Sequence, residues 1–225
     1  NLWYHVGSKD EPAGRSGFAH LFEHLMFNGS ENAPGEYFTP FEQAGATNMN
    51  GTTNTDRTNY FQNVPTTALD MALWMESDRM GHLLGAIDQK TLDEQRGVVQ
   101  NEKRQGDNQP YGLNQYKQLE ALFPEGHPYR HSTIGSMADL DAASLDDVVA
   151  FHDRWYRPSN ASLVISGCVD AEEALRLVER YFAPVGDTGA PAPQHRRGGI
   201  HLDSARRNRT IVRDVPRTSV VLTWP

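Results

Sequence analysis

The ten residues from Phe18 to Phe27 constrain the fold of this chain more than any other stretch. Their apolar members recur three and four positions apart, which is the spacing of a helix face that packs on a hydrophobic core. These residues are Phe18, Leu21, Phe22, Leu25 and Met26. The pattern predicts a short helix here, and Ser16 is its expected N-cap. The opposite face of this helix carries His20, Glu23 and His24.

The two histidines of this face are one helical turn apart, so both imidazoles can bind the same ion. Glu23 lies beside them, where its carboxylate can reach a water molecule on that ion. The order His-x-x-Glu-His is the inverse of the commoner His-Glu-x-x-His order and is the inverzincin motif. The alternative is a solvated helix face. We favour the metal site because aromatic and aliphatic residues, rather than Lys and Arg, surround the three polar residues.

A third ligand is required, because a catalytic zinc ion usually has three protein ligands, and Asp or Glu is an accepted third. A second helix is predicted at 91–105, and seven residues along it return to within about 20° of the same direction. One stripe of this helix consists of Gln95, Val98, Val99 and Glu102. A carboxylate on a face that docks on the core needs a partner. For Glu102 that partner is a metal ion; the alternative is that its side chain extends to solvent or pairs with Arg96 or Arg104.

The order of the predicted elements gives the fold class. The chain opens with a strand at 1–6, the histidine helix follows, and two paired strands come at 45–54 and 58–64. Several helices, a strand at 160–166, another helix, a linker-like stretch at 184–199 and strands at 210–215 and 219–224 complete it. This order predicts an α+β fold with helices packed on one side of a mostly antiparallel sheet. We expect one domain over residues 1–225 that is a fragment of a longer chain.

Charge and composition exclude several classes of function. The net charge of −8 argues against nucleic acid or an anionic membrane surface as the main partner. No apolar run approaches the roughly 20 residues that span a membrane. The single cysteine, Cys168, excludes an internal disulfide and a cysteine-rich zinc ribbon.

The two helical motifs together resemble the pitrilysin/insulinase family of zinc peptidases, family M16. The first motif is His20-Leu-Phe-Glu-His24; after 77 intervening residues, 25–101, the second places Glu102 in Arg-Gly-Val-Val-Gln-Asn-Glu. The flanking Gly-Arg-Ser-Gly-Phe-Ala and Met-Phe-Asn-Gly-Ser are similar to bacterial members. The resemblance covers nearly the whole chain. It implies the pitrilysin/mitochondrial processing peptidase-like metallohydrolase fold, one Zn²⁺ per domain on His20, His24 and Glu102, and Glu23 as general base.

One position departs from the family pattern. Members usually have a second Glu one heptad before the carboxylate ligand, and this chain has Gln95 there. A glutamine can hydrogen-bond a zinc-ligating imidazole or the substrate, but it carries no charge. We therefore expect Gln95 to support the site, with a changed metal affinity or water pKa.

The resemblance also implies an extended peptide substrate that pairs with an edge strand. The expected contacts are Asn48, Asn50, Thr52, Thr53 and Asn54. In the family two such domains, in one chain or in homologous subunits, form the active enzyme, so a second M16 domain is the expected partner. Similarity to exported bacterial peptidases favours a periplasmic or exported location over the cytoplasm.

Two other functions fit part of the pattern. The S-ribosylhomocysteine lyases share the His-x-x-Glu-His helix but use a cysteine as third ligand, and Cys168 lies far downstream. A catalytically impaired M16 scaffold that binds a partner is the second alternative. Such scaffolds have usually lost the His or Glu residues, whereas this chain retains all four. The sequence therefore favours a zinc-dependent metalloendopeptidase.

Overall fold

The computed structural model describes residues 1–187, 210, 212 and 214–223. In this part of the chain four strands form one antiparallel sheet with the order β2-β3-β1-β4. The strands are β1 (Leu2–Tyr4), β2 (Thr47–Thr53), β3 (Thr58–Asn63) and β4 (Ala161–Leu163). β2 and β4 are the edge strands, so β2 pairs with β3 along one side only.

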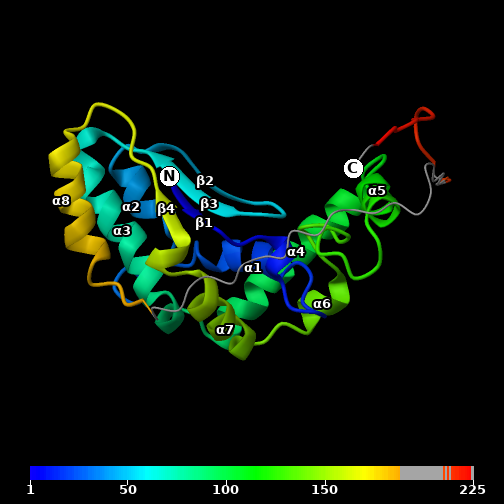
Figure 1. The fold of residues 1–225 in the computed structure, drawn as a ribbon, viewed down its shortest axis with the longest axis horizontal. Coiled ribbons are helices and arrows are strands. Elements are labelled where there is room, and N and C mark those ends of the chain that lie inside the picture. The colour runs from blue at the N-terminus through cyan, green and yellow to red at the C-terminus, as the bar shows by residue number, and fades with distance from the viewer. Residues whose placement is uncertain (188–209, 211, 213, 224–225) are drawn as a thin grey trace.

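The helices lie below and beside the sheet in the view of Figure 1, where α3 and α8 pack together at one end and α5 lies at the other. They are α1 (Phe18–Leu25), α2 (Phe38–Gln43), α3 (Leu69–His82), α4 (Gln89–Asn108), α5 (Asn114–Leu122), α6 (Met137–Asp141), α7 (Leu145–Trp155) and α8 (Ala171–Phe182). The predicted α+β class with an antiparallel sheet is confirmed. Among the described residues, no helix is both long enough and apolar enough to cross a lipid bilayer.

The apolar face of α1 is buried as the spacing predicts. Its five residues, Phe18, Leu21, Phe22, Leu25 and Met26, are each at most 2% exposed. The ring of Phe22 packs on Phe151 and Tyr156, with centroids 5.3 and 4.2 Å away. Burial of such a side chain contributes about 1.5–3 kcal/mol. α1 also contacts β2 and α4, so it is fixed on several sides.

The N-terminus of α1 differs from the prediction. The N-cap is Gly17, whose φ of 92° lies in the left-handed region, and not Ser16. The Ser16 hydroxyl instead donates to Asp139 of α6 at 2.5 Å. The carboxylate of Glu11 accepts hydrogen bonds from the N–H groups of Gly17 and Ala19, at 3.1 and 2.8 Å. A side chain outside the helix thus satisfies its first N–H groups, which no local capping pattern indicates.

Four predicted segments in the C-terminal part of the chain differ from the prediction or lie partly outside the described residues. The strand predicted at 160–166 is shorter, since β4 ends at Leu163, although Val164 N–H still donates to Asn1 O at 2.8 Å. The described residues of 210–215 and 219–224 are not in strands. A strand-like sequence forms a strand only where a partner strand can pair with it, and local pattern does not supply the partner. The predicted linker at 184–199 lies outside the described residues from 188 onward.

Candidate metal centre

The imidazoles of His20 and His24 face each other across one turn of α1. Their Nε2 atoms are 3.3 Å apart. The ring centroids are 4.8 Å apart and the ring planes are nearly perpendicular, at 87°. Each side chain is 18% exposed. The helix therefore brings two nitrogen ligand atoms to one partly covered position, as i and i+4 spacing requires.

Glu102 approaches the same position from α4. Its Oε2 lies 3.7 Å from His20 Nε2, and its Oε1 lies 3.5 Å from His24 Nε2. Ligand atoms of these three residues all lie within 4.8 Å of one another, and they form the one such group of His, Cys, Asp and Glu among the described residues. Arg96, an alternative partner of Glu102, instead donates to the carbonyl oxygens of Leu140 and Ala143, at 2.9 and 2.6 Å.

The predicted stripe on α4 is only half buried. Val99 is fully buried, whereas Val98 is 43% exposed. The Glu102 side chain is itself 44% exposed. The prediction that both valines dock on the core is therefore wrong for Val98, because contact with α1 covers only one edge of the stripe. Glu102 reaches the imidazoles from this partly exposed edge, which leaves the cluster open to solvent along α4.

The protonation of both imidazoles suits metal binding. Burial and, to a smaller extent, the nearby His24 together lower the pKa of His20 to about 4. Burial also lowers the pKa of His24, although the charge of Glu102 opposes this. Both rings are therefore neutral near pH 7, which is the form that binds a metal ion. Two imidazoles and one carboxylate are a known donor set of catalytic zinc sites, so the residues fit this metal.

Gln95 lies beside His24, seven residues before Glu102. Against the effect of burial, a hydrogen bond with Gln95 raises the pKa of His24, so the amide oxygen accepts from the ring. The amide Nε2 of Gln95 donates to Asn28 Oδ1 at 3.3 Å. Asn28 in turn donates to the backbone oxygen of His24 at 3.0 Å. Gln95 thus interacts with the His24 side chain, whereas Asn28 binds the His24 backbone.

Glu23 is buried between α1 and β2, with 7% exposure. Thr53 Oγ1 donates to Glu23 Oε2 at 2.5 Å. Burial raises the pKa of Glu23, the hydrogen bond from Thr53 lowers it, and the charge of Glu102 raises it. The net direction is upward. A carboxylate with a raised pKa is a stronger proton acceptor near neutral pH.

Gly51 allows β2 to approach this close to α1, and the sequence analysis did not identify it. A Cβ atom at Gly51 would lie 2.8 Å from Phe27 Cζ, 3.1 Å from Tyr60 Cδ1 and 3.2 Å from Glu23 Cγ. The available signal was a glycine inside a strand pattern, which often marks the close approach of another chain segment. Glu11, whose carboxylate binds the N–H groups of Gly17 and Ala19 at the start of α1, is the other residue that no sequence pattern indicates.

The five predicted substrate contacts lie on β2 or directly after it. The side chains of Asn48 and Asn50 are exposed, and Asn48 has a left-handed φ of 49°. Thr53 donates to Glu23, and Thr52 Oγ1 donates to Asn59 at 2.5 Å. Asn54 shapes the turn, because its Oδ1 accepts from the N–H groups of residues 56 and 57 at 2.8 and 2.9 Å. The side chains of Thr52, Thr53 and Asn54 therefore form hydrogen bonds within the protein.

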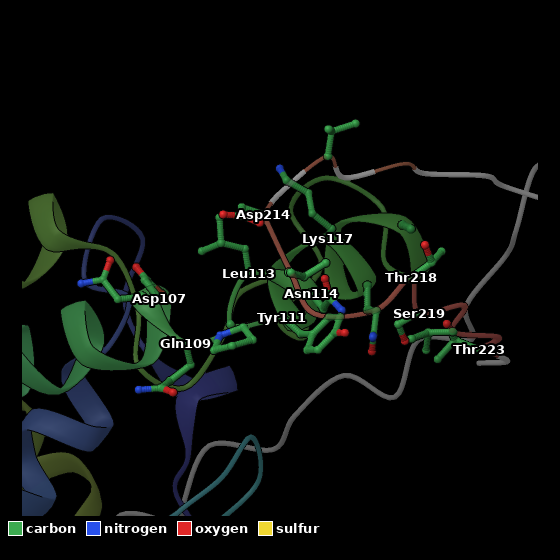
Figure 2. A pocket seen from close by; sticks show the side chains of 18 residues that line it. Asp107, Gln109, Tyr111, Leu113, Asn114, Lys117, Asp214, Thr218, Ser219 and Thr223 are labelled. Atoms are coloured by element: carbon green, nitrogen blue, oxygen red, sulfur yellow. The ribbon is translucent and has the colours of Figure 1, made fainter.

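Two hollows lie apart from the metal cluster. One of about 530 Å³ lies between the α4–α5 junction and the described C-terminal residues (Figure 2). Tyr111 lines it and donates through its hydroxyl to Arg217 O at 2.6 Å. The other, of about 440 Å³, lies between β3 and residues 163–169. Neither contains His20, His24, Glu23 or Glu102 in its lining, so the candidate site lies outside both hollows.

Two family models match the chain. Residues 1–135 match Insulinase (Peptidase family M16), and residues 142–225 match the Peptidase M16 inactive domain. The Zinc protease PqqE of Helicobacter pylori is 31% identical over 182 residues, which are 81% of this chain and 40% of that protein. The chain thus spans less than half the length of this relative.

Solved structures agree with this similarity. A protease from Helicobacter pylori superposes with a TM-score of 0.80 at 30% identity, over 86% of this chain and 46% of that one. The periplasmic protease PqqL from Escherichia coli superposes with a TM-score of 0.72 at 26% identity, over 88% of this chain and 22% of that one.

Proposed function

The chain belongs to the insulinase family of peptidases, family M16, and from this membership we propose that it forms the zinc-binding catalytic part of a metalloendopeptidase. The observation that carries the proposal is the convergence of His20, His24 and Glu102, with ligand atoms within 4.8 Å of one another. A buried carboxylate, Glu23, lies beside this cluster. The relative from Helicobacter pylori is named a zinc protease.

The metal has one role in this proposal. His20, His24 and Glu102 would hold one Zn²⁺, which supplies Lewis acidity for the attack of water on a peptide carbonyl. The chain prepares the site before binding, because both imidazoles are held neutral by burial. Gln95 would orient the His24 ring. The exposed edge at Glu102 leaves room for a substrate.

Glu23 is the proposed general base. Its carboxylate takes a proton from the attacking water and returns it to the nitrogen of the departing amine. General acid–base catalysis of this kind contributes about 10²–10⁴-fold to the rate. The raised pKa of Glu23, caused mainly by burial, supports this role.

The proposed substrate is an extended peptide or a small unfolded protein that adds a strand beside β2. The backbone of an edge strand offers unpaired N–H and C=O groups for strand addition. Asn48 and Asn50 contribute exposed side chains along this edge. Thr52, Thr53 and Asn54 contribute through their backbone, since their side chains bond within the protein.

We also propose a partner and a location. Because the chain spans 40% of one relative and 46% of one solved structure, a second M16 domain would complete the enzyme, in the same chain or in a homologous subunit. The PqqL structure from Escherichia coli is that of a periplasmic protease, which favours an exported location here.

The test uses the complete protein and a fluorogenic peptide. We expect one zinc ion per such domain, hydrolysis that a chelator abolishes, and recovery when zinc is restored. The Glu23→Gln variant should keep its zinc and lose nearly all hydrolysis. Hydrolysis that survives the chelator or the substitution would rule the mechanism out. Bound zinc without hydrolysis by the unmodified protein would instead favour the scaffold function.

A further inference from the structure

Thr53 is the residue of β2 whose side chain reaches the proposed general base. Its Oγ1 lies 2.5 Å from Glu23 Oε2. An ionised carboxylate can only accept hydrogen bonds, so the threonine hydroxyl is the donor. The acceptor belongs to a side chain that is 7% exposed, where water competes weakly for it. A short hydrogen bond to a charged acceptor is among the stronger kinds found in proteins.

Thr58 is the cross-strand neighbour of Thr53. The Cα atoms of Thr53 and Thr58 are partners in the β2–β3 register. Thr58 is fully buried, and its hydroxyl oxygen lies 3.0 Å from the backbone oxygen of Val6. It lies 3.4 Å from Thr53 Oγ1. The hydroxyl of Thr58 donates either to Val6 O or, over the longer distance, to Thr53 Oγ1, and in both cases the hydroxyl hydrogen of Thr53 is left to bind Glu23.

Glu23 needs such a restraint because of its place in the sequence. It directly precedes His24, and carboxylates are accepted zinc ligands. A glutamate beside the ion can therefore act either as a ligand or as a base, and only its side-chain orientation separates the two. The approach of β2, made possible by Gly51, brings the Thr53 hydroxyl to the side of Glu23 that faces the sheet.

We propose that Thr53 is a positioning residue of the peptidase reaction. Its hydroxyl keeps the Glu23 carboxylate on the β2 side of the cluster, oriented to accept the proton of water and kept from becoming an additional metal ligand. This inference rests on the proposed function of the same site. In this proposal the Thr53 side chain binds Glu23 of the enzyme and not the substrate.

The experiment compares two substitutions in the complete, zinc-loaded protein. Thr53→Val keeps the shape of the side chain and removes the donor, whereas Thr53→Ser keeps the donor. Because a misplacement of about 1 Å can cost about 100-fold in rate, we expect Thr53→Val to lower kcat by about 10- to 100-fold with KM within about twofold. Thr53→Ser should retain at least about a third of kcat. Thr67→Val, at an exposed position outside β2, is the matched control and should behave as the unmodified protein.

A second measurement does not depend on hydrolysis. The ¹³C resonance of the Glu23 carboxylate, assigned by its loss in Glu23→Gln, should shift in Thr53→Val and stay in place in Thr53→Ser and Thr67→Val. Zinc affinity should not weaken in any of the three. Equal loss of kcat in the Val and Ser variants, an unchanged Glu23 resonance in Thr53→Val, or weaker zinc binding would overturn the inference. Absence of hydrolysis by the unmodified protein would count against the proposed function, while the resonance would still decide whether Thr53 holds Glu23.

Discussion

Oε1 of Glu102 on α4 lies 3.5 Å from Nε2 of His24 on α1, although 77 residues separate the two in the chain. The packing of the two helices against each other creates this proximity. All three candidate ligands therefore sit on helices rather than on loops, which holds their relative positions firmly. The carboxylate comes from the partly exposed side, so the cluster is rigid on the core side and accessible on the other.

The first prediction concerns the ligand on α4. Glu102→Gln should weaken zinc binding by at least about 100-fold, because a neutral amide replaces the one charged ligand while the two imidazoles remain. Zinc affinity is measured by competition with a chromophoric chelator. Glu94→Gln, on an exposed position of the same helix, is the control and should leave the affinity unchanged. Equal affinity of Glu102→Gln and Glu94→Gln would remove Glu102 from the ligand set.

The second prediction concerns Gln95. Loss of a residue that orients a ligand typically costs 10- to 100-fold in metal affinity or activity, so Gln95→Ala should weaken zinc binding by about 10-fold. Gln95→Glu should strengthen it, because a carboxylate that accepts from the His24 ring makes that ring more basic. Both affinities are compared with Gln105→Ala, an exposed position on the same helix. If Gln95→Glu binds zinc more weakly than the unmodified protein, the prediction that a charged acceptor beside the His24 ring strengthens zinc binding is wrong.

The sequence specifies the site well wherever a single helix defines it. The spacing within Phe18–Phe27 is enough to predict the buried face of α1 and the pairing of His20 with His24, since helix geometry is local. The role of Glu102 is predicted less directly. The stripe on α4 identifies the helix face that carries Glu102, but it does not identify the element that packs against this face. The exposure of Val98 shows this limit.

Features that depend on contacts between distant segments could not be predicted. Glu11, and not Ser16, binds the N–H groups at the start of α1 because the loop before the helix folds back over its N-terminus. Gly51 is required because β2 packs against the side chain of Glu23. In both cases the determining neighbour belongs to another element, and propensity and periodicity describe only one element at a time.

The third prediction is a pH dependence of stability from Asp10. Burial raises the pKa of Asp10 to about 6, against an opposing hydrogen bond from Gly7 N–H, and its ordinary value is 3.8. Between these values the folded protein holds a proton that the unfolded chain has released, so stability falls as the pH rises through this window. The loss amounts to about 1 kcal/mol after allowance for the partial exposure of the group.

Asp10→Asn tests this assignment. The amide oxygen can still accept from Gly7 N–H, and no charge has to be buried. The free energy of unfolding of the variant, from urea titrations at pH 4.5 and pH 7, should depend less on pH by about 1 kcal/mol. The variant should also be the more stable protein at pH 7. If the free energy of unfolding of the variant changes between pH 4.5 and pH 7 as much as that of the unmodified protein, groups other than Asp10 set this pH dependence.

The last prediction concerns the close contact at Gly51. An alanine there would bring its Cβ within 2.8 Å of Phe27 and 3.2 Å of Glu23, so β2 or these side chains must move. Overpacking of this kind typically costs about 1–3 kcal/mol of stability. Displacement of Glu23 should also lower kcat by at least about 10-fold, whereas zinc content stays the same because no ligand moves with β2.

Gly97→Ala is the matched control for this substitution. It lies on α4 between Gln95 and Glu102, and a Cβ there meets nothing within 4 Å. A helical glycine replaced by alanine should stabilise the protein by about 0.5–1 kcal/mol without loss of activity. Thermal unfolding, zinc content and kcat are measured for both variants. If Gly51→Ala matches Gly97→Ala in kcat, β2 can shift without moving Glu23, and the tight packing of β2 on α1 is not needed for hydrolysis.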